Sequence, residues 1–256
     1  MDFTGKKVLI TGGTRGIGRA AVEGFLAAGA RVAVNGSRAD SVAAALAELK
    51  AGERAVAAAG DLSEVEGCRR VVEGAIAALG GLDVLVNNAG VGGPQKRIED
   101  ITADEWDATV NVNLRAVFFC TRYAVPALRE GRGAIVNVAS ILGLGGRGGG
   151  LSLYCASKGG VVNLTRDLAI ELAPDVRVNC VCPGAVDTEM LQELGRSLGD
   201  GDVAAGYAVL TRHRPMQRVA RAAEIANAIL WLASDLASFV TGCIHAVDGG
   251  VMAKAG

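Results

Sequence analysis

Short apolar runs alternate with longer Ala- and Leu-rich stretches along the whole chain, and this alternation constrains the fold more than any other feature. The runs are almost continuously apolar, as expected of parallel strands covered on both faces. Because helical patterns fill the intervals, the chain reads as successive βαβ units, which predicts a doubly wound sheet. The expected strands are KVLIT (7–11), RVAVN (31–35), RAVAAA (54–59), DVLVN (83–87), AIVNVA (134–139), VRVNCV (176–181) and a seventh, CIHAV (243–247).

The helical patterns and the absence of a linker indicate one α/β domain. A chain of 256 residues suits this size, so we expect a single Rossmann-type domain over 1–256, with a seven-stranded parallel sheet flanked by helices. The segment GLGGRGGG (143–150) is too rich in glycine to hold a regular element. Residues 187–219, interrupted by GDGD and Pro215, read as an excursion that forms a substrate lid. Helices are expected at about 16–28, 39–50, 64–79, 103–129, 153–173 and 221–233.

Composition excludes several classes of partner. The net charge of −1 gives no reason to expect a nucleic acid or an acidic membrane surface. The N-terminus lacks the pattern of a signal peptide, and no apolar run reaches the length of a membrane span, so neither is expected. The six cysteines show no metal-type spacing and are expected to be reduced thiols in a cytoplasmic protein.

The first expected strand runs directly into TGGTRGIGRA (11–20), which opens a helix. Gly12 permits a tight turn, Gly16 lets the backbone approach a phosphate, and Gly18 lets the helix pack closely on the sheet. The helix N-terminus then offers free N–H groups to a pyrophosphate. With Thr11, the spacing resembles the TGxxxGIG signature of the short-chain dehydrogenase/reductase family, which also places Thr14, Arg15 and Ile17 at the cofactor.

The end of the second strand favours NADP(H) over NAD(H). NAD enzymes usually carry an acid there that binds the ribose hydroxyls, but this chain has Gly36, followed by Ser37 and Arg38. Arg15 and Arg38 suit a 2′-phosphate, since a guanidinium binds phosphate through two hydrogen bonds. The competing interpretation is that both arginines are solvated loop residues.

Two further segments match positions that contact the cofactor in the family. In GDLS (60–63), the resemblance implies that Asp61 binds the adenine and that Leu62 packs on its ring, although Asp61 could simply cap the next helix. In NNAG (87–90), it implies that Asn87, Ala89 and Gly90 lie near the cofactor. Asn88 is expected to have a largely structural role.

The stretch LSLYCASKGG (151–160) places Tyr154 four residues before Lys158, on one helical face. A nearby ammonium is expected to lower the pKa of the tyrosine, and Ser140, at the end of a strand, can donate to a developing alkoxide. These residues match the family's Ser and Tyr-x-x-x-Lys pattern, although Ser140 and Tyr154 are 14 residues apart and the family commonly has 13. The resemblance implies that Asn113 holds a water linked to Lys158, and that Lys158 also holds the nicotinamide ribose.

The segment CPGAVDTEM (182–190) matches the family's PG motif. The resemblance implies that Pro183, Gly184, Val186 and Thr188 bind the nicotinamide carboxamide. Apolar residues beyond Ser140 and in the expected lid indicate a partly hydrophobic substrate pocket, or else pack the lid onto the body. They include Ile141, Leu142, Met190 and Leu191.

The resemblance implies hydride transfer from NADPH to a carbonyl carbon, with Tyr154 as the proton donor and no metal. It leaves the substrate open between a ketone, a 3-oxoacyl group on a carrier protein, and a sugar acid or polyol. The carrier-protein option requires a basic docking patch, for which Arg129 and Arg132 are available. The alternative from a different functional class is a regulatory protein that binds the dinucleotide but catalyses no reaction. The family usually forms tetramers, so we expect a homotetramer acting on a small molecule.

Overall fold

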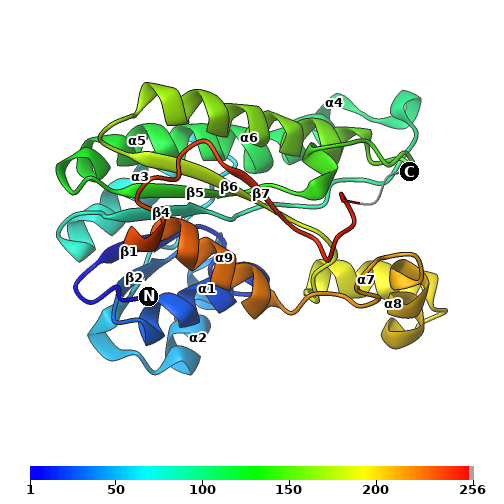
Figure 1. Cartoon of the computed structure of the whole chain (residues 1–256), viewed down its shortest axis with the longest axis horizontal. Helices are drawn as coiled ribbons and strands as arrows, with labels where there is room; N and C mark the ends of the chain where they lie inside the picture. Colours follow the sequence, from blue (N-terminus) through cyan, green and yellow to red (C-terminus); the bar gives the residue numbers. More distant parts are fainter. Residues whose placement is uncertain (254–256) are drawn as a thin grey trace.

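Seven parallel strands lie in the order β3-β2-β1-β4-β5-β6-β7 in a computed structural model that describes residues 1–253 (Figure 1). The order reverses between β1 and β4, which pair through Val8 and Val84. In such sheets the ligand crevice lies outside the carboxyl ends of the strands at this switch point. The strands are β1 (Lys7–Ile10), β2 (Arg31–Val34), β3 (Ala55–Ala57), β4 (Val84–Asn87), β5 (Ala134–Val138), β6 (Arg177–Pro183) and β7 (Ile244–Val247).

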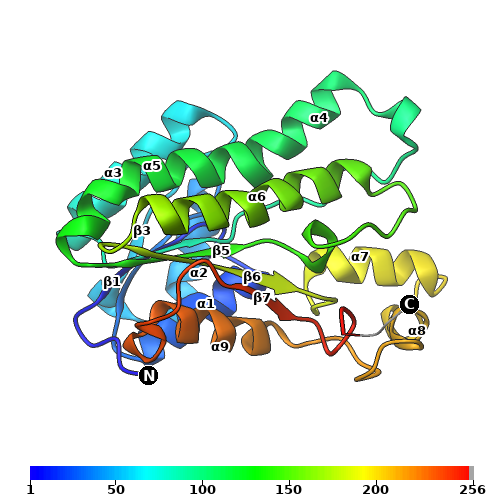
Figure 2. The same cartoon turned by 45° about the horizontal axis from the view of Figure 1, so that its top comes forward.

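Helices cover both faces of the sheet, as Figures 1 and 2 show. Successive side chains of a strand point to opposite faces, so Val8 and Ile10 join one buried cluster and Leu9 joins the other. The helices of the first face are α1 (Gly16–Ala27), α2 (Ala39–Leu49) and α9 (Ala222–Ala233). Those of the second face are α3 (Val65–Leu79), α5 (Ala116–Glu130) and α6 (Ser152–Glu171).

A two-helix excursion leaves the body after β6 and lies to one side of the sheet (Figures 1 and 2). It contains α7 (Glu189–Leu198) and α8 (Val203–Thr211). Its two ends meet in a narrow neck, where Asp187 N–H donates to the Ala220 carbonyl at 2.8 Å and Ala220 N–H donates to the Ala185 carbonyl at 2.9 Å. The chain therefore leaves the core at residue 187 and rejoins it beside the same point after residue 219.

The predicted doubly wound, seven-stranded parallel sheet is confirmed, with differences in detail. The helix expected over 103–129 consists of α4 (Ala103–Val110), a π-helical turn (Asn111–Arg115) and α5. The third strand is only three residues long, because a 3₁₀ turn (Gly52–Arg54) takes up the chain before it. The last three residues of the expected domain lie outside the described residues.

Candidate active site

The glycine-rich turn after β1 is shaped by close backbone contacts. A Cβ atom on Gly18 would overlap the carbonyl oxygen of Gly12, so α1 can pack this closely only with glycine there. Gly12 and Gly16 have φ of +62° and +56°, the left-handed region that favours glycine. A Cβ on Gly16 would lie 3.2 Å from the Thr188 side chain, so the turn faces the segment that follows β6.

Buried polar side chains fix this turn to the neighbouring strands. Asn35, at the end of β2, accepts a hydrogen bond from Gly12 N–H at 3.2 Å and donates to the Ala58 carbonyl at 2.8 Å. Asn88 donates through Nδ2 to the carbonyls of Thr11 and Gly12 at 2.9 and 3.0 Å, which is the structural role expected of it. The sequence analysis did not single out Asn35, although an amide that ends an apolar strand was a usable signal.

The residues expected at the adenosine ribose lie together at the exposed edge of the crevice. A Cβ on Gly36 would lie 2.7 Å from the Thr14 side chain, so a larger residue there would require that side chain to shift. Arg15 forms an ion pair with Glu189 of α7, and Arg38 forms one with Asp40. The Arg38 hydrogen bond lowers the pKa of Asp40 to about 2. Both guanidiniums are exposed, and each already holds a carboxylate.

The expected adenine contacts are only partly arranged as predicted. Asp61 is exposed and accepts two hydrogen bonds from Ser63, from its N–H and its hydroxyl, both at 2.9 Å. These hydrogen bonds close a turn ahead of α3 and do not cap it, since the N-cap of that helix is Glu64 and no side chain bonds to its first turn. Leu62 is buried in the core beside Cys68, so its side chain presents little surface on which an adenine ring could pack.

The Asn87 side chain belongs to a buried polar network. Its side chain points into the core, where Nδ2 donates to Asn137 Oδ1 at 2.9 Å and to Thr121 Oγ1 at 3.2 Å. Asn137 is its register partner on β5 and in turn donates to Thr165 Oγ1 at 2.9 Å. All four side chains are buried, so Asn87 joins two strands and two helices and its amide does not face the crevice.

Ser140 and Tyr154 lie against each other at the carboxyl end of β5. The Ser140 hydroxyl accepts a hydrogen bond from Leu142 N–H at 3.1 Å. Burial raises the pKa of Tyr154, and hydrogen bonding with Ser140 opposes that rise without cancelling it. The expectation that Lys158 lowers this pKa is therefore wrong for the polypeptide itself, because desolvation of the phenolate outweighs the favourable contacts.

Lys158 is buried below Tyr154. Its Nζ atom donates to the Val138 carbonyl at 3.0 Å and lies 6.0 Å from the centre of the tyrosine ring. Burial lowers the pKa of Lys158 to about 8. A Cβ on Gly90 would lie 3.2 Å from this Nζ atom and 3.3 Å from Asn113 Oδ1. The backbone of the NNAG segment therefore lies directly against Lys158 and Asn113. Ala89, the residue before Gly90, is half-buried.

Asn113 lies in the π-helical turn, a feature frequent at functional sites. Its fully buried amide accepts from Val91 N–H at 2.8 Å and donates to the Val91 carbonyl at 2.9 Å, which clamps the chain after the NNAG segment. It also donates to Ser157 Oγ at 3.1 Å, and Ser157 donates to the Tyr154 carbonyl at 2.8 Å. Ser157 is a second residue that sequence analysis missed.

The PG segment brings the chain from β6 to the excursion. A Cβ on Gly184 would lie 2.9 Å from Asp248 Cα, so this glycine is set by close packing. Val186 is buried and pairs with Ala220, whereas Thr188 is half-buried and faces Gly16. Pro183 ends β6.

The expected substrate residues border the same crevice from two sides. Ile141 and Leu142 form a half-buried 3₁₀ turn after Ser140. Met190 is 49% exposed, and its sulfur would lie 3.7 Å from a Cβ on Gly92, so α7 reaches across to the strand-β4 side of the site. Leu191 is half-buried on the same helix.

The basic residues considered for carrier-protein docking are at the wrong end of the sheet. Arg129 and Arg132 precede β5, whereas Ser140 follows it, so the full length of that strand separates them from the site. Arg129 also lies 3.9 Å from Asp175. Within residues 1–253, no group of three His, Cys, Asp or Glu side chains is placed to hold a metal ion. No helix of this part of the chain has the length and apolarity needed to span a membrane.

Comparisons with known proteins agree with this geometry. The family described as enoyl-(acyl carrier protein) reductase matches residues 12–252. The cis-4-hydroxycyclohexanecarboxylate dehydrogenase of Sinomonas cyclohexanicum is 39% identical over 98% of both chains. The meso-2,3-butanediol dehydrogenase of Serratia marcescens is 38% identical and is matched over 100% of this chain and 98% of its own. The structure of L-sorbose reductase from Gluconobacter frateurii complexed with NADPH and L-sorbose has a TM-score of 0.94, 31% identity and coverage of 100% and 99%.

The chain belongs to the short-chain dehydrogenase/reductase family. It is an NAD(P)-dependent oxidoreductase that acts on alcohol or carbonyl groups of small-molecule substrates.

Proposed function

We propose that the protein is an NADP(H)-dependent reductase of a ketone, or dehydrogenase of the corresponding secondary alcohol, with Tyr154 as its general acid and base. The observation that carries this proposal is the convergence of Ser140, Tyr154 and Lys158 beyond the carboxyl end of β5, which is the neighbour of β4 in the sheet. A raised pKa keeps the phenol of Tyr154 protonated at neutral pH. That is the form needed to give a proton to the oxygen of a carbonyl that is being reduced.

Each neighbouring side chain supports that transfer. The dinucleotide, when bound, supplies the hydride. Ser140 donates to the substrate oxygen and fixes it beside the phenol. Lys158 uses one of its three N–H groups on Val138, which leaves the others for a ribose hydroxyl, and Asn113 holds the backbone after the NNAG segment in place.

The preference for NADP(H) rests on the edge of the site near the ribose. The glycine-rich turn offers the pyrophosphate its backbone N–H groups, and α1 begins there with Gly16. Gly36, which packs against Thr14, supplies no carboxylate where NAD enzymes carry the acid that binds the ribose hydroxyls. Arg15 and Arg38 are the cations available for a 2′-phosphate, which would compete with Glu189 and Asp40 for them.

We favour a ketone or secondary alcohol with an apolar body as the substrate. Ile141, Leu142 and Met190 supply apolar surface on both sides of the crevice, and segment 187–219 acts as a lid over it. A sugar or polyol is the second candidate, because a similar structure is described as L-sorbose reductase. The position of Arg129 and Arg132 counts against docking of a carrier protein by those residues.

A homotetramer in the cytoplasm fits the surface and the cysteines. Phe118 on α5 is 48% exposed, Ile170 on α6 is 80% exposed, and Phe239 before β7 is fully exposed, so these three elements present apolar surface that partner subunits would cover. All six cysteines are free thiols, as expected of a reducing compartment. A monomeric mass in light scattering would rule the tetramer out.

The test is the oxidation of NADPH and NADH over a panel of butane-2,3-dione, L-sorbose, 4-oxocyclohexanecarboxylate and its methyl ester. We expect turnover with at least one compound, faster with NADPH, and a loss of about 10²–10⁴-fold in kcat for Tyr154→Phe. Retained NADPH binding in Tyr154→Phe, followed by protein fluorescence, is the control for folding. Binding of NADPH without turnover of any compound would instead support the non-catalytic regulator.

A further inference from the structure

The glycine-rich loop between Ser140 and Tyr154 is an ordered element that presents a single cation. Gly148, Gly149 and Gly150 have φ of +71°, +69° and +79°. This is the left-handed backbone conformation, which only glycine adopts readily. Gln95 Nε2 donates to the Gly149 carbonyl at 2.8 Å, and Lys96 N–H donates to the Gly150 carbonyl at 3.1 Å. These hydrogen bonds hold the loop against the segment after β4, and Arg147 lies directly before the three glycines.

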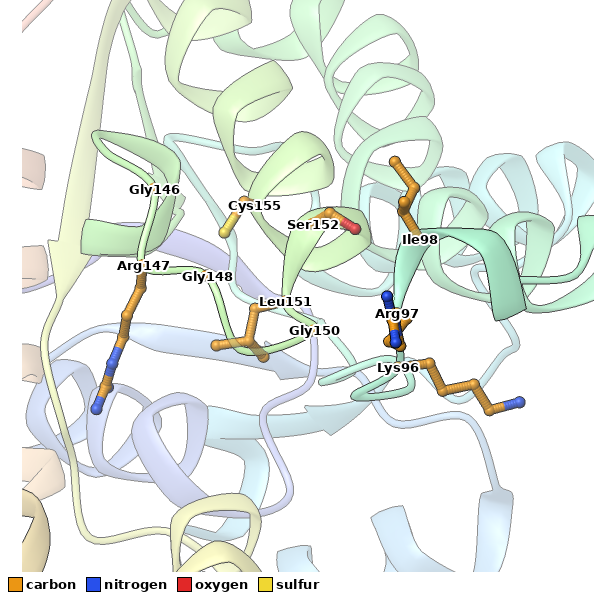
Figure 3. A pocket seen from close by; sticks show the side chains of 10 residues that line it. All are labelled: Lys96, Arg97, Ile98, Gly146, Arg147, Gly148, Gly150, Leu151, Ser152 and Cys155. Atoms are coloured by element: carbon orange, nitrogen blue, oxygen red, sulfur yellow. The ribbon is translucent and has the colours of Figure 1, made fainter.

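A cavity of about 310 Å³ lies between this loop, the segment after β4 and the start of α6 (Figure 3). Its lining includes Leu151, Ser152 and Cys155 at the start of α6, the helix that also carries Tyr154. Arg147 extends from one side of this cavity, whereas Lys96 points away from the other (Figure 3). Lys96 forms an ion pair with Glu105, and Arg97 forms one with Glu99, so these two charges are already matched.

Arg147 has a second cation as its neighbour, Arg214 at the end of the lid. Burial lowers the pKa of Arg214, and the charge of Arg147 lowers it further. The segments that carry the two arginines share a neighbour near the C-terminus: a Cβ on Gly145 would lie 3.8 Å from Met252, and one on Gly250 would lie 3.2 Å from Pro215. The lid and the glycine loop therefore pack on the same segment.

Neither Arg147 nor Arg214 takes part in an ion pair formed within residues 1–253. Asp248 attracts Arg214, but its oxygens accept hydrogen bonds from Gly250 N–H at 2.9 Å and Met252 N–H at 2.7 Å. Arg214 donates through Nε to the Leu210 carbonyl at 2.9 Å, which leaves the far end of its guanidinium available.

We propose that Arg147 and Arg214 form an anion subsite at the substrate entrance, which binds a carboxylate or phosphate group carried by the substrate away from its reacting carbon. An anion placed between two neighbouring guanidiniums relieves their repulsion and gains charge-assisted hydrogen bonds. Since one arginine comes from the loop and the other from the lid, such an anion would also join the two. This inference rests on the proposed function and assigns it a class of substrate.

The experiment compares kcat/KM for 4-oxocyclohexanecarboxylate with that for its methyl ester, which lacks the charge. In the wild type we expect the acid to be preferred, and in Arg147→Ala and Arg214→Ala we expect the ratio of acid to ester to fall about 10- to 30-fold, through KM for the acid. Arg147→Lys should restore part of the ratio. Arg97→Ala, which removes a matched charge from the same cavity, is the control and should leave the ratio within about twofold.

The source of the anion is distinguished by a second pair, acetoacetyl-CoA and the uncharged acetoacetyl-N-acetylcysteamine. A preference for the CoA ester that Arg147→Ala abolishes assigns the subsite to a carrier phosphate, and a preference confined to the acid assigns it to a small carboxylate. If the ester and the uncharged thioester are reduced as well as their charged partners, the subsite is refuted and the proposed function stands. If none of the four compounds nor the other ketones is reduced, the proposed function itself fails.

Discussion

Replacing Asn87 with alanine separates a structural role from a cofactor role for the first asparagine of the NNAG segment. The substitution removes two hydrogen bonds from a buried network, one to Asn137 Oδ1 and one to Thr121 Oγ1. It also removes the link between β4 and β5 at their carboxyl ends, where the two asparagines are register partners. It takes no side chain away from the crevice.

The loss of stability follows from the groups left without a partner. A buried polar atom that loses its hydrogen bond costs about 1–3 kcal/mol, so Asn87→Ala should lower the free energy of unfolding by about 2–4 kcal/mol. For a domain of this size, about 2–4 °C of melting temperature corresponds to each kcal/mol, which gives a drop of roughly 5–15 °C. The Kd of NADPH should change by less than about threefold, or about 0.7 kcal/mol.

Both quantities are measured on the same samples, by thermal unfolding followed with circular dichroism and by titration of NADPH fluorescence. The double variant with Asn137→Ala should lose less than the sum of the two single variants, because the two side chains share one interaction. Asn88→Ala is the contrasting variant, since Asn88 holds the carbonyls of Thr11 and Gly12 and should weaken NADPH binding. An Asn87→Ala protein that melts normally but binds NADPH more than about tenfold more weakly would show that the reasoning is wrong.

Three more predictions concern the cofactor site. Arg15→Ala and Arg38→Ala should each raise the Kd of NADPH about fivefold or more and leave the Kd of NADH nearly unchanged, since hydrogen bonds to charged groups contribute about 1.5–3 kcal/mol. An equal effect on the Kd of both cofactors would count against a 2′-phosphate site. Because the pKa of Lys158 falls to about 8 from 10.5, the unfolded chain holds a proton over this interval that the folded chain has released. The free energy of unfolding should therefore rise with pH from about 8 to 10.5, by at most about 3 kcal/mol, relative to Lys158→Met; a flat difference would contradict it. Gly18→Ala should abolish dinucleotide binding in calorimetry, because its Cβ overlaps the Gly12 carbonyl, and unchanged binding would disprove the assigned packing.

Local sequence patterns predicted the helices and strands well, because the formation of these elements depends mainly on residues that are neighbours in sequence. The apolar runs and the helical periodicity lie close to the observed bounds, and the expected excursion 187–219 lies between the contacts of its neck. The extent of the helix over 103–129 was also predicted, but not its π-helical turn. That turn accompanies the hydrogen bonds of Asn113 to Val91, which is distant in sequence and close only in the folded chain.

The direction of side chains at strand ends could not be predicted in the same way. Asn87 and Asn88 are adjacent amides at the end of one strand, and the pleat sends one into the core and the other toward the glycine-rich turn. Which of them faces the crevice depends on the partner strand, here Asn137 of β5. The pKa of Tyr154 is decided by the sum of its surroundings, and so its direction also differed from the expectation based on Lys158 alone.

Spacing along the chain was sufficient to predict the order of elements, the glycine-rich turn after the first strand, and the chain positions of Ser140, Tyr154 and Lys158. Which charges influence one another depends on the folded chain. Arg129 lies at the far end of β5, and Arg147 of the glycine loop lies close enough to Arg214 of segment 187–219 for its charge to lower the pKa of that arginine. Contacts between segments 67 residues apart depend on how the lid and the C-terminal segment pack, and no local pattern specifies that packing.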